Sequence, residues 1–437
     1  MDKILNKKFI PPLIGRYYHF IWPFLGNLIH GAPSKKIKVI GVTGTNGKTT
    51  VVHLATEILE EAGFKVASIS SLRFKVGDKE WKNELKMTMP GRMVIQKFLS
   101  YAVKEGCEYC VLEVTSEGIK QFRHKFINFN TAAFTNLTPE HIESHGGFEN
   151  YKRAKAELFK KIKNGISIIN LDDESADYFL KFPSKEKYAY TIQKSPLELN
   201  IPKHYGGVRV IEARDVEASN SGIEFSVDGV KFSLSLLGMF NVHNALAAIC
   251  IGISHGVSLE SMSNTLAKVP AIPGRMEVVI KEPFSVIVDY AHTPDALEKV
   301  YKTIKESDGG IKKESRMICV LGSAGGGRDK WKRPKMGEIA AKYCDQIICT
   351  NEDPYDESPE GILDDIEEGI KDFTTAMISC FRTLDRREAI KKSMETAKPG
   401  DVVVITGKGA EPWMVTKEGK IPWDDREVVR EEMKKLG

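Results

Sequence analysis

The chain has 437 residues, which is too long for one ordinary hydrophobic core, so two or three domains are expected. Its 42% hydrophobic and 28% charged residues are those of a soluble globular protein. The 63 basic and 59 acidic residues nearly balance at a net charge of +4, so nothing in the charge indicates a nucleic-acid partner and none is expected.

The first predicted element is a short aromatic and basic segment, residues 1–35, with the stretch IGRYYHFIWPFLGNLIHG. Pro23 interrupts this stretch, which is shorter than the roughly 20 apolar residues that span a bilayer. No small-residue cleavage site of a secretion signal follows it. The basic residues up to the first strand are Lys3, Lys7, Lys8, Arg16, Lys35, Lys36 and Lys38, against Asp2 alone.

Two interpretations of this segment stay open. It can be a helix packed on the next domain. Alternatively, its aromatic and basic residues suit peripheral contact with a membrane surface. We expect a cytoplasmic protein, located at the inner membrane surface under the second interpretation.

Short apolar runs alternate with amphipathic stretches after residue 36. This alternation predicts an α/β fold with a mostly parallel sheet. The predicted strands are 37–42, 66–70, 109–114, 131–137 and 166–170, and the predicted helices are 49–63, 91–106 and 150–165.

The pattern changes to period two between residues 207 and 237, where NSG and DG mark hairpin turns, so an antiparallel patch is expected. A helix over 241–256 follows. A second α/β block, expected to be Rossmann-like, has strands 284–290, 317–322, 346–350 and 401–406 and helices 294–305 and 332–344. The stretch IPGRME at 272–277 gives the best boundary, so we expect a central domain over 36–275 and a C-terminal domain over 276–437.

The stretch GVTGTNGKTT, between a strand and a helix, predicts a polyphosphate-binding loop. Backbone N–H groups and the dipole at a helix N-terminus attract phosphate, and glycines allow close approach. Lys48 would neutralise the β- and γ-phosphates and Thr49 would hold Mg²⁺. Val42 stands where the strict motif has its first glycine. The expected nucleotide contacts are Gly44, Thr45, Asn46, Gly47, Lys48, Thr49 and Thr50.

Further motifs follow in order: LEVTSEGI, TNLTPEHIESHGGFENYKRAKAELF, NLDDE, GMFNVHNALAA, IPGRME, VDYAHTPDALE, GGGRDKWKRPKMG, NEDPYDESPE, GKGAE and DDREVV. With TGTNGKTT, they resemble the Mur ligase superfamily, and specifically the MurE type, the UDP-N-acetylmuramoyl-peptide:amino-acid ligases. The resemblance spans residues 38 to about 430. It implies an ATP-dependent, ADP-forming ligase of peptidoglycan synthesis. ATP would phosphorylate the carboxylate of a UDP-muramoyl-peptide, and an amino acid would attack the acyl phosphate.

The resemblance implies a catalytic centre of Lys48, Glu113, His141 and Lys155. Glu113, His141, Thr49 and Lys155 would bind Mg²⁺, Lys155 as a carbamate. A carboxylate at the end of a strand can instead cap the next helix, and Lys155 can be a solvated helix lysine. Glu140 stands where the family usually has Asp, and His145 is interpreted as a loop hydrogen-bonding residue.

The resemblance also implies residues for ATP and for the donor. The base would contact Asn241, His243 and Asn244, although Asn241 can also be a helix N-cap. Residues that close over ATP would be Arg275, Asp289, Tyr290 and His292. The muramoyl-peptide would contact Thr115, Gln121 and Arg123. Glu117 stands where the family has His.

The acceptor site departs from the diaminopimelate-adding members, because Tyr355 replaces an Arg that would clamp a carboxylate. Glu352, Asp353, Asp356 and Glu357 make this stretch acidic, so a lysine-like acceptor is predicted rather than meso-diaminopimelate. These acids can equally form an exposed turn. Ala410 replaces a usual His. The other expected acceptor contacts are Arg328, Gly407 and Glu411.

Only about 35 residues precede the ATPase strand, too few for the usual UDP-binding domain of the family. Three explanations stay open: the UDP group is bound loosely, a second protein binds it, or the donor is different and lipid-linked.

Alternative functions are a ligase of the polyglutamate or folate type, or a nucleotide-binding subunit of a glutamine amidotransferase. The seven cysteines are expected as buried thiols in a reducing compartment, and CEYC at 107–110 as strand packing rather than a zinc or redox site.

Overall fold

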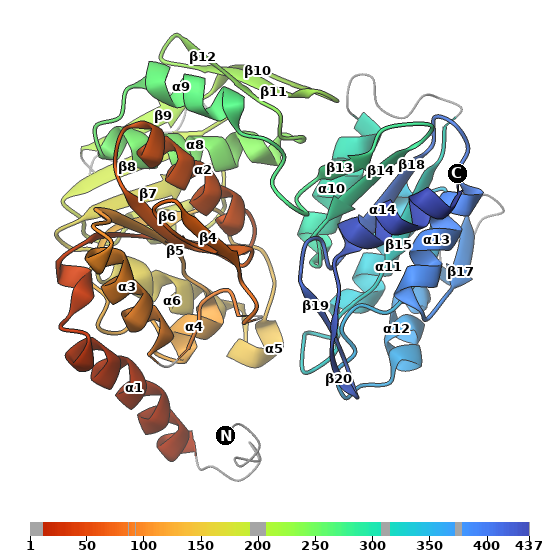
Figure 1. Cartoon of the computed structure of the whole chain (residues 1–437), viewed down its shortest axis with the longest axis horizontal. Coiled ribbons are helices and arrows are strands. Elements are labelled where there is room, and N and C mark those ends of the chain that lie inside the picture. Colours follow the sequence, from red (N-terminus) through yellow and green to blue (C-terminus); the bar gives the residue numbers. More distant parts are fainter. Residues whose placement is uncertain are drawn as a thin grey trace.

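The structure is a computed structural model that describes residues 12–85, 87–91, 93–192, 207–306, 315–371 and 378–436. Figure 1 shows two lobes side by side, with the chain passing from one to the other near residue 275. A long helix, α1 (Pro12–Ile29), extends from the bottom of the first lobe.

A nine-stranded sheet organises the first lobe, in the order β4-β3-β2-β5-β1-β6-β7-β8-β9. Pairing is parallel from β2 to β9, and β3 and β4 add an antiparallel hairpin at one edge. The strands are β1 (Lys38–Thr43), β2 (Val66–Ile69), β3 (Arg73–Val76), β4 (Lys79–Lys82), β5 (Tyr109–Glu113), β6 (Phe129–Phe134), β7 (Ile166–Asn170), β8 (Glu186–Thr191) and β9 (Val208–Glu212).

Helices cover both faces of this sheet, as its apolar strands require. One face packs on α2, α8 and α9, and the other on α3, α6 and α7. The helices are η1 (Pro33–Lys35), α2 (Lys48–Glu61), α3 (Val94–Lys104), α4 (Ser116–Lys120), α5 (Ile142–His145), α6 (Phe148–Phe159), α7 (Ala176–Leu180), α8 (Phe240–Ser254) and α9 (Leu259–Lys268).

The antiparallel patch forms a separate three-stranded sheet of β10 (Arg214–Ser219), β11 (Gly222–Val227) and β12 (Val230–Leu234). Its apolar side chains, among them Phe225 and Phe232, join the core beneath α8. The prediction was too broad at one end, because β9 pairs in parallel with β8 and belongs to the large sheet. Alternation of apolar and polar residues indicates a half-buried strand, but it does not indicate whether the neighbouring strand is parallel or antiparallel.

The second lobe is a Rossmann-like layer with the sheet order β13-β14-β18-β15-β16-β17, parallel except for β13. One face packs on α10, α11 and α12, and the other on α13 and α14. The elements are β13 (Glu277–Ile280), β14 (Ser285–Asp289), α10 (Pro294–Glu306), β15 (Met317–Leu321), α11 (Lys332–Tyr343), β16 (Gln346–Cys349), α12 (Pro359–Lys371), β17 (Ser379–Arg382), α13 (Arg386–Thr396), β18 (Val402–Thr406) and α14 (Asp425–Leu436). A hairpin of β19 (Trp413–Thr416) and β20 (Gly419–Pro422) lies on the side facing the first lobe (Figure 1).

The cysteine prediction was wrong for one pair. Cys319 on β15 and Cys344 at the end of α11 form a disulfide, with Cα atoms 6.1 Å apart. They are 25 residues apart in the sequence, and only the α11 crossover brings them together. Cys107 and Cys110 are free thiols within the hydrophobic core, as expected for strand packing.

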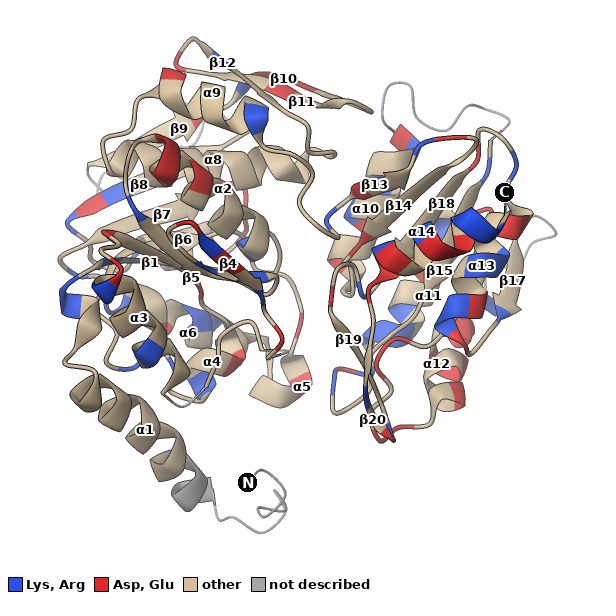
Figure 2. Ribbon diagram, in the orientation of Figure 1, with Lys and Arg blue, Asp and Glu red and all other residues tan. Residues whose placement is uncertain are grey.

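The N-terminal segment is helical where it is described; Lys3, Lys7 and Lys8 lie outside the described residues. Gly26 of α1 approaches α3 so closely that an added Cβ would lie 3.1 Å from Met93 and 3.2 Å from Gln96. The described side chains of α1 carry no charge (Figure 2). Within the described ranges, every helix is too short or too polar to cross a membrane.

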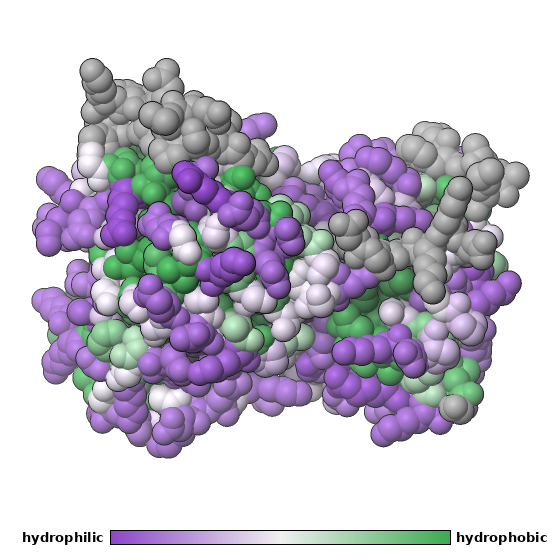
Figure 3. All heavy atoms as spheres, turned by 90° about the horizontal axis from the view of Figure 1, so that it is seen from above, coloured by the Kyte–Doolittle hydropathy of each residue, from purple (hydrophilic) through white to green (hydrophobic). Residues whose placement is uncertain are grey.

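The surface is mostly hydrophilic when viewed from the side of β10–β12, with smaller hydrophobic areas between the polar ones (Figure 3). The two lobes meet at a narrower waist in the same view. The cavity described next lies between these lobes.

Candidate active site

The phosphate loop connects the end of β1 to the start of α2 and follows the backbone of residues 135–136. A Cβ on Gly44 would lie 1.8 Å from Thr135 Oγ1, and a Cβ on Gly47 would lie 2.2 Å from Asn244 Oδ1. The Thr45 N–H donates to Asn136 O (2.9 Å) and the Asn46 N–H to Asn136 Oδ1 (2.8 Å). Only glycine fits at both positions, which explains why Gly44 and Gly47 stand where they do in the motif.

Lys48 begins α2, where the helix dipole adds positive charge. Its Nζ donates to Thr45 O at 2.7 Å, so the side chain folds back over the loop. Burial lowers the pKa of Lys48, while the nearby Glu113 carboxylate opposes this shift. A phosphate entering the loop would add an anion beside this half-buried amine.

Glu113 ends β5 directly beside β1, opposite Val42 in the parallel register. It is buried, and its Oε1 accepts the Ser71 N–H at 3.0 Å. The Thr49 and Ser71 hydroxyls are 2.8 Å apart. Carboxylate and hydroxyl oxygens are the ligands that Mg²⁺ prefers, so this group fits the expected metal position next to the phosphates.

Lys155 of α6 is buried, at 2% exposure, which contradicts the alternative of a solvated lysine. Its Nζ donates to Gly44 O at 2.6 Å and lies 4.5 Å from the centre of the Tyr151 ring. Burial and, next, the charge of Lys48 lower the pKa of Lys155 well below its usual value. The structure therefore places an amine with a raised neutral fraction against the phosphate loop.

His141 precedes the short helix α5 with a left-handed backbone (φ 57°). Burial, followed by the charge of Arg328, lowers the pKa of His141 to about 2, so its ring is neutral. The Asp329 carboxylate, from the second lobe, accepts the N–H groups of Ile142 (2.9 Å) and Glu143 (3.1 Å). The position of His141 thus depends on contact between the lobes.

Glu140 and His145 each lie next to a charged residue that the sequence analysis did not identify. Glu140 pairs with Lys332 at 3.2 Å, and both side chains are buried. This ion pair between the lobes accounts for a carboxylate at that position. His145 lies 3.4 Å from Glu117, whose other contact is the Ser144 hydroxyl at 2.5 Å.

The expected base-binding residues lie at the start of α8. Asn244 Nδ2 donates to Asn241 Oδ1 (2.8 Å), and Asn241 Nδ2 donates to Leu237 O (2.7 Å). His243 Nε2 lies 3.0 Å from Asp172. The N-cap of α8 is Met239, so the alternative that Asn241 caps the helix is wrong.

Arg275, where the chain crosses between the lobes, and Asp295 of the second lobe reach the phosphate loop. Arg275 Nη2 lies 3.4 Å from both Thr49 Oγ1 and Ser71 Oγ, and its guanidinium lies 4.3 Å from the Tyr290 ring. Asn46 Nδ2 donates to Asp295 of α10 at 3.0 Å. These contacts close the second lobe over the nucleotide end.

Two neighbouring groups hold that closed arrangement. Asp289 accepts the backbone N–H groups of Met276 (2.7 Å) and Ala291 (2.6 Å), fixing the chain beside Arg275. His292 Nδ1 lies 2.9 Å from Tyr290 O. Burial lowers the pKa of His292 well below its usual value, so it contributes no charge.

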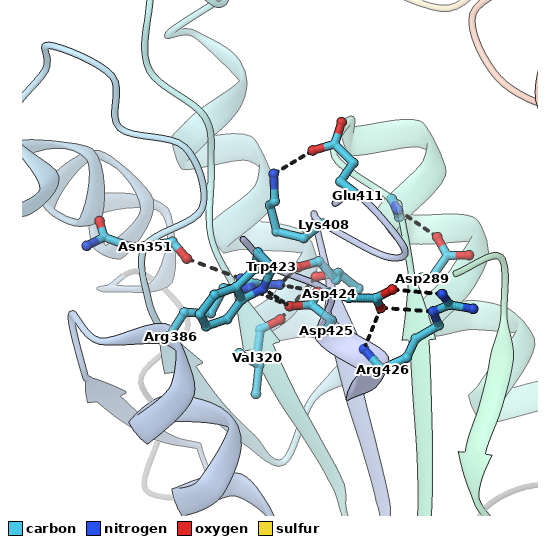
Figure 4. Close-up of polar contacts among 12 residues, drawn as sticks. Asp289, Val320, Asn351, Arg386, Lys408, Glu411, Trp423, Asp424, Asp425 and Arg426 are labelled. Carbon is cyan, nitrogen blue, oxygen red and sulfur yellow. Dashed lines mark hydrogen bonds and ion pairs between the residues drawn. The ribbon is translucent and has the colours of Figure 1, made fainter. Parts of the chain in front are cut away.

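The acceptor end is less acidic than the sequence indicated. Lys408 is buried and lies 3.0 Å from Asp353 and 2.5 Å from Glu411; Figure 4 shows its contact with Glu411. Burial opposes its charge, but Glu411 and Asp353 outweigh burial and raise the pKa of Lys408. Sequence reasoning missed Lys408, although it stands in the quoted GKGAE motif.

The remaining acceptor residues surround this group. Tyr290 donates its hydroxyl proton to Glu411 at 3.0 Å. Tyr355 has a left-handed backbone (φ 55°) and packs against Gly326, where a Cβ would lie 2.6 Å from the ring. Asp356 is exposed and Glu357 pairs with Arg333 at 2.8 Å, so both turn away from the cavity.

Glu352 is a buried carboxylate beside Gly407, where an added Cβ would lie 2.5 Å from Glu352 Oε2. Burial and, next, Asp353 raise the pKa of Glu352 to about 7 from 4.5. The folded protein therefore holds this proton more tightly than the unfolded chain. Ionisation lowers stability as the pH rises from 4.5, and the loss is complete above 7.

We expect Glu352→Gln to raise the free energy of unfolding above pH 7, by up to about 3 kcal/mol, since one pKa unit corresponds to about 1.4 kcal/mol. The part of this difference that comes from ionisation should vanish below pH 4.5, where the Glu352 carboxyl is neutral in the folded and the unfolded chain. Urea unfolding of both proteins across this range measures the difference. A constant difference at every pH would contradict a raised pKa.

The residues expected to bind the donor lie at the other end of the cavity. Thr115 Oγ1 accepts the Gly118 N–H at 3.0 Å and caps α4. Arg123 Nη1 donates to Met89 O, and its Nη2 donates to Gln121 Oε1 at 2.6 Å. These residues present hydroxyl, amide and guanidinium groups toward one space.

A single cavity of about 1320 Å³ joins all three regions. Every predicted site residue except Gly407 lines it, including Lys155, Arg328 and Glu411. Gly407 lies behind Glu352 and acts through close packing. One continuous space thus runs from the donor residues past the phosphate loop to the acceptor residues.

Residues 42–252 match the Mur ligase middle domain, and residues 274–409 match the Mur ligase glutamate ligase domain. A UDP-N-acetylmuramoyl-L-alanyl-D-glutamate–2,6-diaminopimelate ligase of Syntrophomonas wolfei is 38% identical over 406 residues, 92% of this chain and 79% of that protein. The chain belongs to the Mur ligase family. It is accordingly an ATP- and Mg²⁺-dependent, ADP-forming amide ligase of cell-wall synthesis.

Other relatives and solved structures support the assignment to this family. The like-named ligase of Aquifex aeolicus is 37% identical over 411 residues, 93% of this chain and 80% of that protein. A solved structure of a ligase with the same name covers 100% of this chain and 86% of that one, with a TM-score of 0.60 and 29% identity. Folylpolyglutamate synthase of Mycobacterium tuberculosis shares the fold at 16% identity and a TM-score of 0.66, covering 87% and 91% of the two chains.

The prediction of a lysine-like acceptor is wrong, because these relatives at 37–38% identity are named as 2,6-diaminopimelate ligases. The reasoning counted acids along the sequence. In the structure, Lys408 pairs with both Asp353 and Glu411 and offsets one of their two charges, while Asp356 and Glu357 face away from the cavity. Arg328, which the sequence analysis expected at the acceptor site, lines the same cavity as Tyr355 and supplies a cation there.

Proposed function

We propose that this Mur ligase joins 2,6-diaminopimelate to UDP-N-acetylmuramoyl-L-alanyl-D-glutamate, with ATP converted to ADP and phosphate. The single cavity that connects donor, phosphate and acceptor residues supports this proposal. The named relatives supply the identity of both substrates. The chain would divide into residues 1–35, a central ATP-binding domain over 36–275 and an acceptor domain over 276–437.

The proposed reaction proceeds in two steps. A carboxylate oxygen of the donor displaces ADP from the γ-phosphorus of ATP and forms an acyl phosphate. The amine of the acceptor then attacks the acyl carbon, phosphate leaves, and one amine proton is lost. Lys48, Arg275 and the N-terminus of α2 would hold the phosphates in line for the first step.

We propose Thr49, Glu113, His141 and carbamylated Lys155 as metal ligands. Bound Mg²⁺ would supply positive charge against the phosphoryl group in transfer. The burial of Lys155 supports its carbamylation, because CO₂ adds to the neutral amine. Carbamylation would replace a cation near Lys48 with an anion, and an added carboxylate in the same cavity as Glu113 suits a divalent ion.

The proposed function predicts phosphate release from Mg-ATP that requires both the UDP-muramoyl-dipeptide and diaminopimelate. Lysine and ornithine in place of diaminopimelate should give much less release. The Lys48→Ala variant serves as the control and should release none, because it loses the cation of the loop. Release that occurs without the donor, or equally with lysine, would contradict the proposed substrates.

We further propose that the protein is cytoplasmic and that α1 contacts the inner membrane surface. Tyr17, Ile21 and Leu28 are 69%, 48% and 67% exposed along one side of α1. Lys35 and Lys36 follow and are exposed, which suits anionic headgroups.

Vesicles that contain anionic lipid should therefore co-sediment with the full chain. The variant Ile21→Glu/Leu28→Glu should co-sediment much less, because it places charge in the apolar side. Equal sedimentation of the two proteins, or none with the parent, would contradict membrane contact.

A further inference from the structure

The loop that carries Gln121 and Arg123 packs against α1. Phe20 lies 6.1 Å from Phe122 and 5.3 Å from Phe126, between ring centres, and Phe24 lies 5.5 Å from Phe126. All three pairs are edge-on, the arrangement that aromatic rings favour. Two residues of α1 one turn apart thus contact both ends of the loop over 121–126.

The loop has an unusual backbone at both of these contacts. Phe122 (φ 56°) and Phe126 (φ 60°) adopt the left-handed region, which bulky residues avoid unless their surroundings hold them there. Phe126 O accepts from Gln96 Nε2 at 3.3 Å and from Ser34 Oγ at 3.4 Å. The rings of α1 add side-chain contacts to these backbone bonds.

Arg123 lies between these two residues and reaches the cavity. It bonds to Met89 O and to Gln121 Oε1, and an added Cβ on Gly91 would lie 3.3 Å from its Nε. His19 of α1 lines the same cavity. The helix therefore contacts the loop from outside and also forms part of the wall inside.

We propose that α1 is a positioning element of the donor site. Phe20 and Phe24 hold the loop over 121–126 in the conformation that directs Gln121 and Arg123 into the cavity. His19 completes the wall at that end. The identity of the donor in this inference rests on the proposed function, while the hold of α1 on the loop does not.

The double variant Phe20→Ala/Phe24→Ala tests this role in the full chain, with Ile29→Ala as the matched control. Ile29 is 65% exposed on the same helix. Amide hydrogen exchange should become at least tenfold faster across 121–126 in the double variant and stay unchanged in the control. The KM for the donor should rise about tenfold, while kcat and the KM for ATP stay within about twofold, because 1.4 kcal/mol of lost binding corresponds to tenfold.

Each outcome decides one point. Unchanged exchange at 121–126 would overturn the hold of α1 on the loop, whatever the donor. Faster exchange with an unchanged KM would overturn the link to donor binding. A parent protein that shows no turnover with the UDP-muramoyl-dipeptide would refute the proposed function, and the exchange measurement would still decide the role of α1. Restored protection in Phe20→Leu/Phe24→Leu would show that apolar packing suffices.

Discussion

Replacing Lys155 with alanine is expected to abolish turnover, with a loss of at least about a thousandfold in kcat. The side chain is buried against Gly44 O and the Tyr151 ring, so it acts at the phosphates and not in solvent. Under the proposed role of Lys155 as a metal ligand, its loss removes several kcal/mol of stabilisation from the transition state of phosphoryl transfer, and each 1.4 kcal/mol is about tenfold in rate. Phosphate release from Mg-ATP with both substrates measures the effect.

Lys152→Ala is the matched control for this experiment. Lys152 lies three residues earlier on α6 and pairs with Glu149 at 2.7 Å, and the variant should keep the activity of the parent. Short carboxylic acids such as acetate should partly restore Lys155→Ala if the carbamate supplies an anion. Activity of Lys155→Ala near that of the parent would refute a catalytic role. Strict dependence on the lysine, with no restoration and no effect of removing CO₂, would refute the carbamate alone.

The chain order of the α/β units was predictable because each parallel strand is a short apolar run and each covering helix is amphipathic. The same rule placed Glu113 correctly, since the carboxyl ends of β1 and β5 meet at one edge of the sheet. Strands at the edge of the sheet were not predicted, because they lack such an apolar run. The strand β4 is exposed along its length, and Trp81 is its single apolar residue, too little to mark a strand.

Contacts between the lobes were beyond prediction because they join residues far apart in the sequence. Lys332 lies 192 positions from Glu140, and Asp329 lies 187 positions from Ile142 of α5. Charge in the acceptor region likewise depends on pairs formed within the second lobe, such as Lys408 with Asp353 and Arg333 with Glu357, and so a count of acids along 352–357 gave the wrong acceptor. The aromatic spacing of α1 was visible in the sequence, but its partners Phe122 and Phe126 were not.

Arg386 is expected to be the most important polar residue for the stability of the second lobe. It is fully buried and forms two bonds to Asp425, at 2.8 and 2.7 Å (Figure 4). The same guanidinium donates to Asn351 O (3.2 Å) and Thr406 O (2.8 Å). These carbonyls immediately precede Glu352 and Gly407, so one side chain joins the two segments that form the acceptor end.

Arg386→Leu should therefore lower the free energy of unfolding by about 3–5 kcal/mol, because it leaves Asp425 charged, buried and short of partners. Arg386→Leu/Asp425→Leu should recover part of that loss, since no unpaired charge remains. Arg387→Leu is the control: its pairs with Glu431 and Glu432 are partly exposed, and such pairs contribute at most about 1 kcal/mol.

Urea unfolding of the four proteins gives the free energies of unfolding. The KM for the acceptor shows whether the segments that carry Glu352 and Gly407 keep their positions. We expect this KM to rise in both Arg386 variants, because the carbonyls of Asn351 and Thr406 lose their common donor in each. The KM for the donor should stay unchanged, since the donor residues belong to the other lobe. A single variant as stable as Arg387→Leu would show that the buried ion pair adds little beyond the packing that replaces it. An unchanged KM for the acceptor would show that Glu352 and Gly407 keep their places without Arg386.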